Sequence, residues 1–148
     1  MNVEKIIKTD KQIPITSRTI IHLSLVEAMI NEMMTAALKP HSVSLQQFNV
    51  LRILRGQKGK PANLSTLNER MVTKMSNTTR LVDKLILKGY VDRMVCPSNR
   101  RKVEINITSN GESALSLMDL AMKETEEKLL ENFSTDDLRS LNDLLDKF

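Results

Sequence analysis

The chain has 148 residues, of which 41% are hydrophobic and 27% charged, and its formal net charge is +4. This length suffices for one domain with a substantial core, and no apolar run approaches the roughly 20 residues of a membrane-spanning helix. A single cysteine excludes an internal disulfide, so we expect a protein of the reducing cytoplasm.

The first third of the chain predicts one long helix after a charged amino terminus. Residues 1–12 alternate lysines with acids and lack the apolar core of a signal peptide. Ser17 is the expected N-cap of a helix that runs to about Ala37. This helix is apolar on more than one face, which indicates that it is buried on two sides. Three of its methionines are either core residues or the lining of an adaptable pocket at a dimer interface: Met29, Met33 and Met34.

A second helix is predicted by residues 43–48. Ser44 and Gln47 form a capping box, and apolar residues on either side of the box form a hydrophobic staple. The helix should end near Gly56, where two glycines, two lysines and a proline within seven residues indicate a loop. Asn63 is the expected N-cap of the short helix that follows.

The next helix is expected from Lys74 to Lys88 and has one apolar and one polar face. Thr73 is its expected N-cap, and Gly89 lies where a helix ends in the left-handed conformation. The polar face consists of Ser76, Asn77, Thr79, Arg80, Asp83 and Lys84. Hydroxyl, amide and guanidinium groups are those that bind base edges and phosphates. For this helix alone, an ordinary solvated face is the alternative interpretation.

Beyond this helix the apolar period changes from 3.6 to 2, which indicates a β-hairpin. Residues 90–95 indicate the first strand, residues 97–99 the turn, and residues 102–107 a half-buried second strand. Three adjacent cations lie at or just past the tip: Arg100, Arg101 and Lys102. A basic tip alone is typical of soluble surface. Directly after two helices it indicates a wing that contacts phosphates or the minor groove.

Two more helices complete the chain. Thr108 or Ser109 should open a long helix to about Asn132, and residues 133–138 repeat the staple and the capping box. The last helix carries a stripe of four apolar residues: Leu138, Leu141, Leu145 and Phe148. Together with the first long helix, these helices present more apolar surface than one core covers, which predicts a two-fold dimer. Helices that fold back on their own domain are the alternative.

Charge is unevenly distributed along the chain. Residues 64–108 hold nine Lys and Arg against four Asp and Glu, whereas residues 109–148 hold four against ten. The basic charge therefore accompanies the expected recognition helix and wing, and the carboxy-terminal helices should face away from DNA.

The stretch from Leu64 to Ser109 resembles the MarR (multiple antibiotic resistance regulator) family. The resemblance is carried by RLVDKL at 80–85, KGYVDR at 88–93, NRR at 99–101 and INIT at 105–108, and the order of elements extends it from about Thr16 to Phe148. It implies a dimeric winged-helix repressor or activator that a small ligand or oxidation often regulates. The family's wing carries an acidic-x-Arg motif whose Arg enters the minor groove. Arg101 matches this Arg, but Asn99 replaces the acid and cannot form its ion pair.

We therefore expect a mainly α fold with a small β-hairpin wing, in a single domain over residues 1–148. A winged helix-turn-helix at about 40–108 would be flanked by dimerisation helices at about 16–38 and 109–148. The expected function is a dimeric repressor of a pseudo-palindromic operator in double-stranded DNA, with a small-molecule effector. The expected DNA-binding residues are Ser76, Asn77, Thr79 and Arg80 in the major groove, Arg101 in the minor groove, and Lys74, Lys84, Arg100 and Lys102 on phosphates.

Other functions have weaker signals. A protein-interaction module on the same scaffold is the alternative function, and a thiol-responsive regulator acting through Cys96 is another. The soft metal ligands His22, His41 and Cys96 are too scattered to predict a metal site. No nucleophile with a base, paired acids or glycine-rich phosphate loop indicates an enzyme or a cofactor.

Overall fold

The computed structural model describes residues 1–73 and 77–148. The elements in chain order are α1 (Val3–Ile6), α2 (Ile15–Leu38), the 3-10 turn η1 (Lys39–His41), α3 (Leu45–Gly56), α4 (Leu64–Arg70), α5 (Thr78–Leu87), β1 (Val91–Cys96), β2 (Asn99–Ile107), α6 (Ser109–Leu129) and α7 (Thr135–Leu145). The predicted mainly α fold with a β-hairpin wing is confirmed. Within the described ranges, no helix combines the length and the apolar character needed to cross a membrane.

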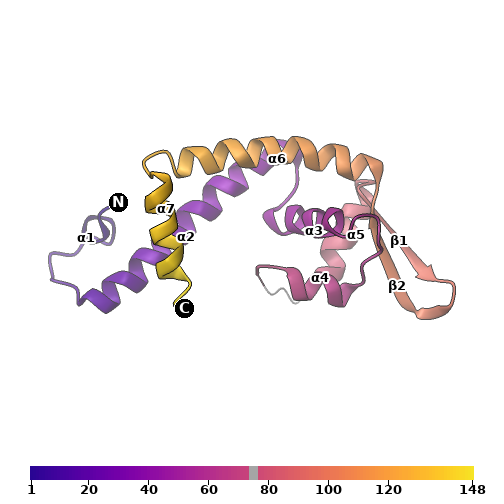
Figure 1. Ribbon diagram of the computed structural model, residues 1–148, viewed down its shortest axis with the longest axis horizontal. Coiled ribbons are helices and arrows are strands. Elements are labelled where there is room, and N and C mark those ends of the chain that lie inside the picture. The colour runs from indigo at the N-terminus through magenta and orange to yellow at the C-terminus, as the bar shows by residue number, and fades with distance from the viewer. Residues whose placement is uncertain (74–76) are drawn as a thin grey trace.

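The elements gather at two ends of an elongated molecule (Figure 1). At one end lie α3, α4, α5, β1 and β2, which we call the winged-helix part. At the other lie α1, α7 and the amino-terminal half of α2, and α6 runs across the top between the two ends. We call α1, α2, α7 and residues 120–129 of α6 the arm.

One cluster of buried apolar residues lies beneath α6 in the winged-helix part. It unites Leu51 and Leu54 of α3, Val82 and Leu85 of α5, Ile105 of β2, and Leu115 and Met118 of α6. The helices that supply it begin where local capping predicts. Ser44 and Gln47 exchange hydrogen bonds of 2.9 and 3.2 Å in a capping box, and Asn63 accepts a hydrogen bond of 2.8 Å from the Thr66 N–H.

The start of α2 differs from the sequence prediction. The helix begins at Ile15 behind Pro14, not behind an N-cap at Ser17. Proline fixes its own φ near the helical value, and the Pro14 carbonyl accepts the first helical hydrogen bond from the Arg18 N–H at 2.9 Å. The side chain of Ser17 is therefore not needed to start the helix.

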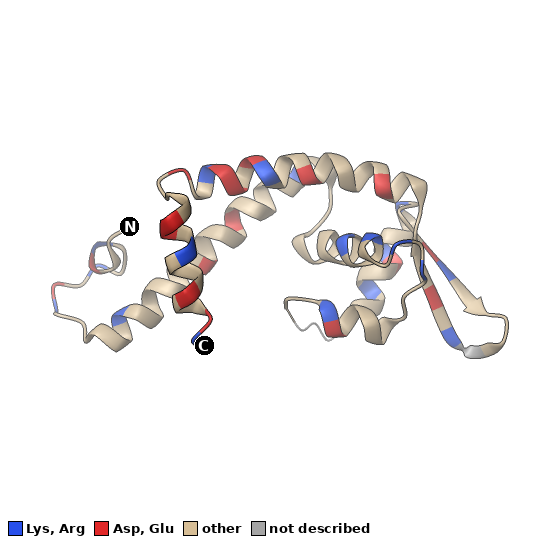
Figure 2. Cartoon of the chain, in the orientation of Figure 1, with Lys and Arg blue, Asp and Glu red and all other residues tan. Residues whose placement is uncertain are grey.

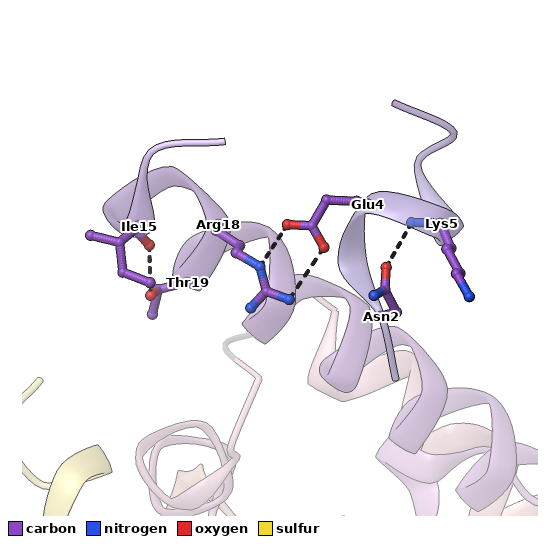
Figure 3. A network of polar contacts seen from close by, with 6 residues as sticks. All are labelled: Asn2, Glu4, Lys5, Ile15, Arg18 and Thr19. Atoms are coloured by element: carbon purple, nitrogen blue, oxygen red, sulfur yellow. Dashed lines mark hydrogen bonds and ion pairs between the residues drawn. The ribbon is translucent and has the colours of Figure 1, made fainter. Parts of the chain in front are cut away.

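The short helix α1 was not predicted, because it depends on a distant part of the chain. Val3 is fully buried, and α1 packs on α2. Glu4 accepts hydrogen bonds of 2.7 and 3.3 Å from the Arg18 guanidinium (Figure 3). These bonds hold the pKa of the Glu4 carboxyl below its ordinary value. A four-residue helix has too few internal hydrogen bonds to persist alone, so contacts with α2 stabilise it.

Candidate DNA-binding surface

The helix-turn-helix is formed by α4 and α5. Thr78, the first residue of α5, is only 4% exposed, and its hydroxyl donates a hydrogen bond to the Asn68 side chain of α4. Asn77 is the N-cap of α5, because its side chain accepts a hydrogen bond from the Arg80 N–H at 3.3 Å. The predicted N-cap at Thr73 is therefore wrong. The first residue of the recognition helix is therefore determined by the contact between α4 and α5 together with the local cap.

Several predicted DNA contacts can now be located on α5. Thr79, Arg80 and Lys84 are exposed, while Val82 and Leu85 are buried, so the two faces of this helix are arranged as predicted. The predicted contacts at Lys74 and Ser76 lie outside the described residues. Asn77 is exposed, and its side-chain oxygen accepts the capping hydrogen bond. Its amide NH₂ group is a donor that the cap does not use. Gly89 has a φ of 71°, so the predicted left-handed helix end is confirmed.

The hairpin has an irregular tip. Val91 lies opposite Ile107 and Val95 opposite Val103, but Cys96 lies opposite Asn99. The turn therefore consists of Pro97 and Ser98 alone, and Asn99, expected in the turn, begins β2.

This register shift leaves residues 100–102 of β2 between two paired positions, as a bulge in the ladder next to the turn. The three adjacent cations predicted at the tip thus occupy the bulge. Lys102 is exposed. The side chains of Arg100 and Arg101 lie outside what the structure describes, so their contacts with phosphates and with the minor groove stay predictions.

An ion pair joins the recognition helix to the hairpin. The Arg93 Nη1 of β1 lies 2.6 Å from the Asp83 Oδ1 of α5. Sequence reasoning placed Asp83 on the polar face but missed Arg93, because a pair of opposite charges ten residues apart across a turn has no local signature. The bond adds a direct contact between α5 and β1 to the packing of Leu85 and Val91 in the core.

Charge is distributed over the structure as the sequence suggests. Figure 2 shows Lys and Arg on α3, α5 and the hairpin, whereas acidic residues are frequent on α7 and on the adjoining end of α6. Within the described ranges, Arg80, Lys84 and Lys102 have no ion-pair partner. These three cations are therefore available to an external anion.

The remaining candidate groups are dispersed. Over residues 1–73 and 77–148, no three His, Cys, Asp or Glu side chains are placed to hold a metal ion. Cys96 is half-buried, and its Sγ lies 3.1 Å from the Ser98 Oγ across the turn. Its role as a redox-sensitive thiol stays a prediction.

A buried helix-turn-helix joint, an exposed polar face on its second helix and a hairpin tied to that helix define a winged helix-turn-helix protein. The family model described as MarR family matches residues 43–103. The chain is 29% identical over 126 residues to the HTH-type transcriptional regulator PecS of Dickeya dadantii, which covers 83% of this chain and 75% of PecS. Over these residues the chain is similar to the MarR family of transcriptional regulators.

Solved structures share the fold. A MarR-like transcription regulator from Bacillus cereus ATCC 10987 superimposes with a TM-score of 0.80 at 23% identity, over 90% of this chain and 96% of that one. A mutant MarR from E. coli complexed with operator DNA gives a TM-score of 0.76 at 24% identity, over 90% and 93% of the two chains. The likeness therefore extends beyond the matched segment to most of the arm.

Proposed function

We propose that the chain acts as a homodimeric repressor that binds a two-fold operator in double-stranded DNA. In each subunit α5 lies in the major groove and the hairpin tip reaches the adjacent minor groove. The observation that carries the proposal is the set of unpaired cations Arg80, Lys84 and Lys102, on a helix and a hairpin that the Asp83–Arg93 pair holds together. A DNA backbone supplies the anions that these side chains lack among the residues the structure describes.

The homodimer is supported by exposed apolar side chains of the arm. Ile15 is 73% exposed and Phe148 87% exposed, and Ile20, Leu141, Leu144 and Leu145 are exposed as well. α7 buries none of its residues within the chain. A second copy can cover this surface, and a two-fold dimer also sets two recognition helices about one DNA turn, roughly 34 Å, apart.

Regulation by a small molecule is part of the proposal. An open groove lies where α2 meets η1 and the start of α3, and its lining includes Glu27, Asn31, Thr35, Lys39 and Val43. The groove adjoins both the arm and the winged-helix part, so a ligand there could favour one arrangement of the two parts. Such a ligand changes DNA affinity only if it binds the two arrangements with different affinities. We propose that the protein acts in the cytoplasm, because that compartment contains the operator DNA.

Selection of binding sites from random duplex DNA tests the proposal. We expect an enriched two-fold motif, and an affinity for it that falls steeply from about 50 to 200 mM salt, at roughly −0.9 in log K per phosphate contacted. Lys102→Ala should lower the magnitude of that slope by about two, since each of the two subunits loses one phosphate contact. Lys123→Ala, an exposed change on α6, is the matched control and should leave the slope unchanged. A one-sided motif refutes the dimer, and no binding at low salt refutes the DNA function.

A further inference from the structure

An ion pair links α3 of the winged-helix part to α6. The Arg55 Nη1, in the last turn of α3, lies 2.5 Å from the Asp119 Oδ2, near the middle of α6. A lysine four residues along the same helix, Lys123, is within reach of Asp119 by spacing but pairs with Glu127 at 3.8 Å. Asp119 therefore forms a contact between two elements in place of one within its own helix.

The amino-terminal end of α6 is anchored separately. The Thr108 hydroxyl donates a hydrogen bond of 2.6 Å to the Gly89 carbonyl, and the Thr108 N–H donates one of 3.0 Å to the Tyr90 carbonyl. Gly111 lies so close to the Tyr90 carbonyl that a Cβ there would approach its oxygen to 2.1 Å. This end of α6 therefore has little freedom to move relative to the turn between α5 and β1.

Asp119 lies eight residues beyond this anchor, which is about 12 Å along the helix. A rotation of α6 by about 10° around the anchor would move Asp119 by about 2 Å and Leu129 by about 5 Å, given a rise of 1.5 Å per residue. The first displacement breaks the ion pair. The displacement of Leu129 exceeds the distance of roughly 3.4 Å between successive base pairs.

Apolar packing beneath α6 restrains that rotation as well, and the ion pair adds a directional contact to it. Met118 and Met122 contribute to the buried cluster, and methionine side chains adapt to small shifts of their neighbours. Hydrophobic burial is non-directional, whereas a hydrogen-bonded ion pair favours one geometry, even where its side chains are partly exposed as here.

From this arrangement we infer that Arg55 and Asp119 are positioning residues for operator spacing. They hold α6, and with it the dimerising arm, at the angle that sets the distance between the two recognition helices of the dimer. The inference rests on the proposed function, since only a dimer on a two-fold operator has a spacing to recognise.

The test compares operators that differ only in spacing. Affinities of the full-length protein are measured for the selected operator, for versions with one base pair added or removed between half-sites, and for a single half-site. Asp119→Asn should weaken binding to the selected operator about two- to fivefold, as an exposed ion pair allows. It should also reduce the ratio between the affinity for the selected operator and the affinities for the altered spacings. Its affinity for the half-site should not change. Glu127→Gln, which breaks the pair within α6, is the matched control and should keep the wild-type preference.

A charge swap provides the rescue. Arg55→Asp combined with Asp119→Arg should restore the spacing preference, whereas Arg55→Asp alone should lose it. The inference is overturned if Asp119→Asn keeps the wild-type ratio of affinities between spacings, including the case in which only its melting temperature falls. Wild-type protein that binds no two-fold operator would instead refute the proposed function, and the inference with it.

Discussion

Replacing Gly111 by alanine should destabilise the protein, although the same change within a helix ordinarily stabilises it by about 1 kcal/mol. Gly111 lies in the first turn of α6, and a Cβ there would lie 2.1 Å from the Tyr90 carbonyl oxygen and 2.8 Å from the Ile107 Cγ1. The first of these atoms belongs to the backbone and accepts a hydrogen bond from the Thr108 N–H. It cannot rotate away as a side chain could, so the helix or the turn must shift.

Overpacking of this kind costs about 1–3 kcal/mol, and a weakened hydrogen bond about 1 kcal/mol more. After the gain in helix propensity is subtracted, the free energy of unfolding should fall by about 1–3 kcal/mol, and the melting temperature on the order of 5 °C. Urea and thermal unfolding followed by circular dichroism measure both quantities.

Gly56→Ala is the matched control for this prediction. Gly56 is the last residue of α3, and a Cβ there meets nothing within 4 Å. Alanine at this position should leave stability unchanged or raise it by up to about 1 kcal/mol. If Gly111→Ala is as stable as the wild type while Gly56→Ala behaves as expected, the close approach of α6 to the Tyr90 carbonyl does not constrain the fold.

Three further predictions concern α5, the dimer and acid sensitivity. Arg80→Ala should change the selected DNA motif at a cost of about 1–3 kcal/mol for a lost base contact, and an unchanged motif would show that α5 contacts DNA differently. Deletion of residues 133–148 should yield monomers or aggregates in sedimentation, and a stable, soluble dimer would place the interface elsewhere. Hydrogen bonds from the Ser134 hydroxyl and N–H hold the pKa of Asp137 below its ordinary value. The contribution of this cap to stability is therefore complete above the ordinary Asp pKa and is lost as the pH falls through the lowered one. Asp137→Asn should flatten the loss of helicity in acid and Asp136→Asn should not, so identical acid profiles would contradict this.

Much of the secondary structure follows from residues three or four positions apart. The capping boxes of α3 and α7 are confirmed, with Ser134 and Asp137 exchanging hydrogen bonds of 2.9 and 3.2 Å. Asn63 and Gly89 act at helix ends as expected. The two faces of α5 were predictable for the same reason, since helical periodicity places Arg80 and Lys84 opposite the buried side. Local hydrogen bonds and periodicity depend only on neighbouring residues, so the sequence by itself determines them.

The remaining features depend on residues that only the folded chain brings together. α5 begins at Thr78 because that residue is buried at the joint with Asn68, and α1 exists because Val3 is buried and Glu4 meets Arg18. The contact between α5 and the wing includes a pair between a helix and a strand, and the bulge at the tip depends on the pairing register of two strands. The angle of α6 depends on residues 64 positions apart. Contacts of this kind carry no local pattern, because their partners are chosen by the packing of whole elements, and so only the tertiary structure decides them.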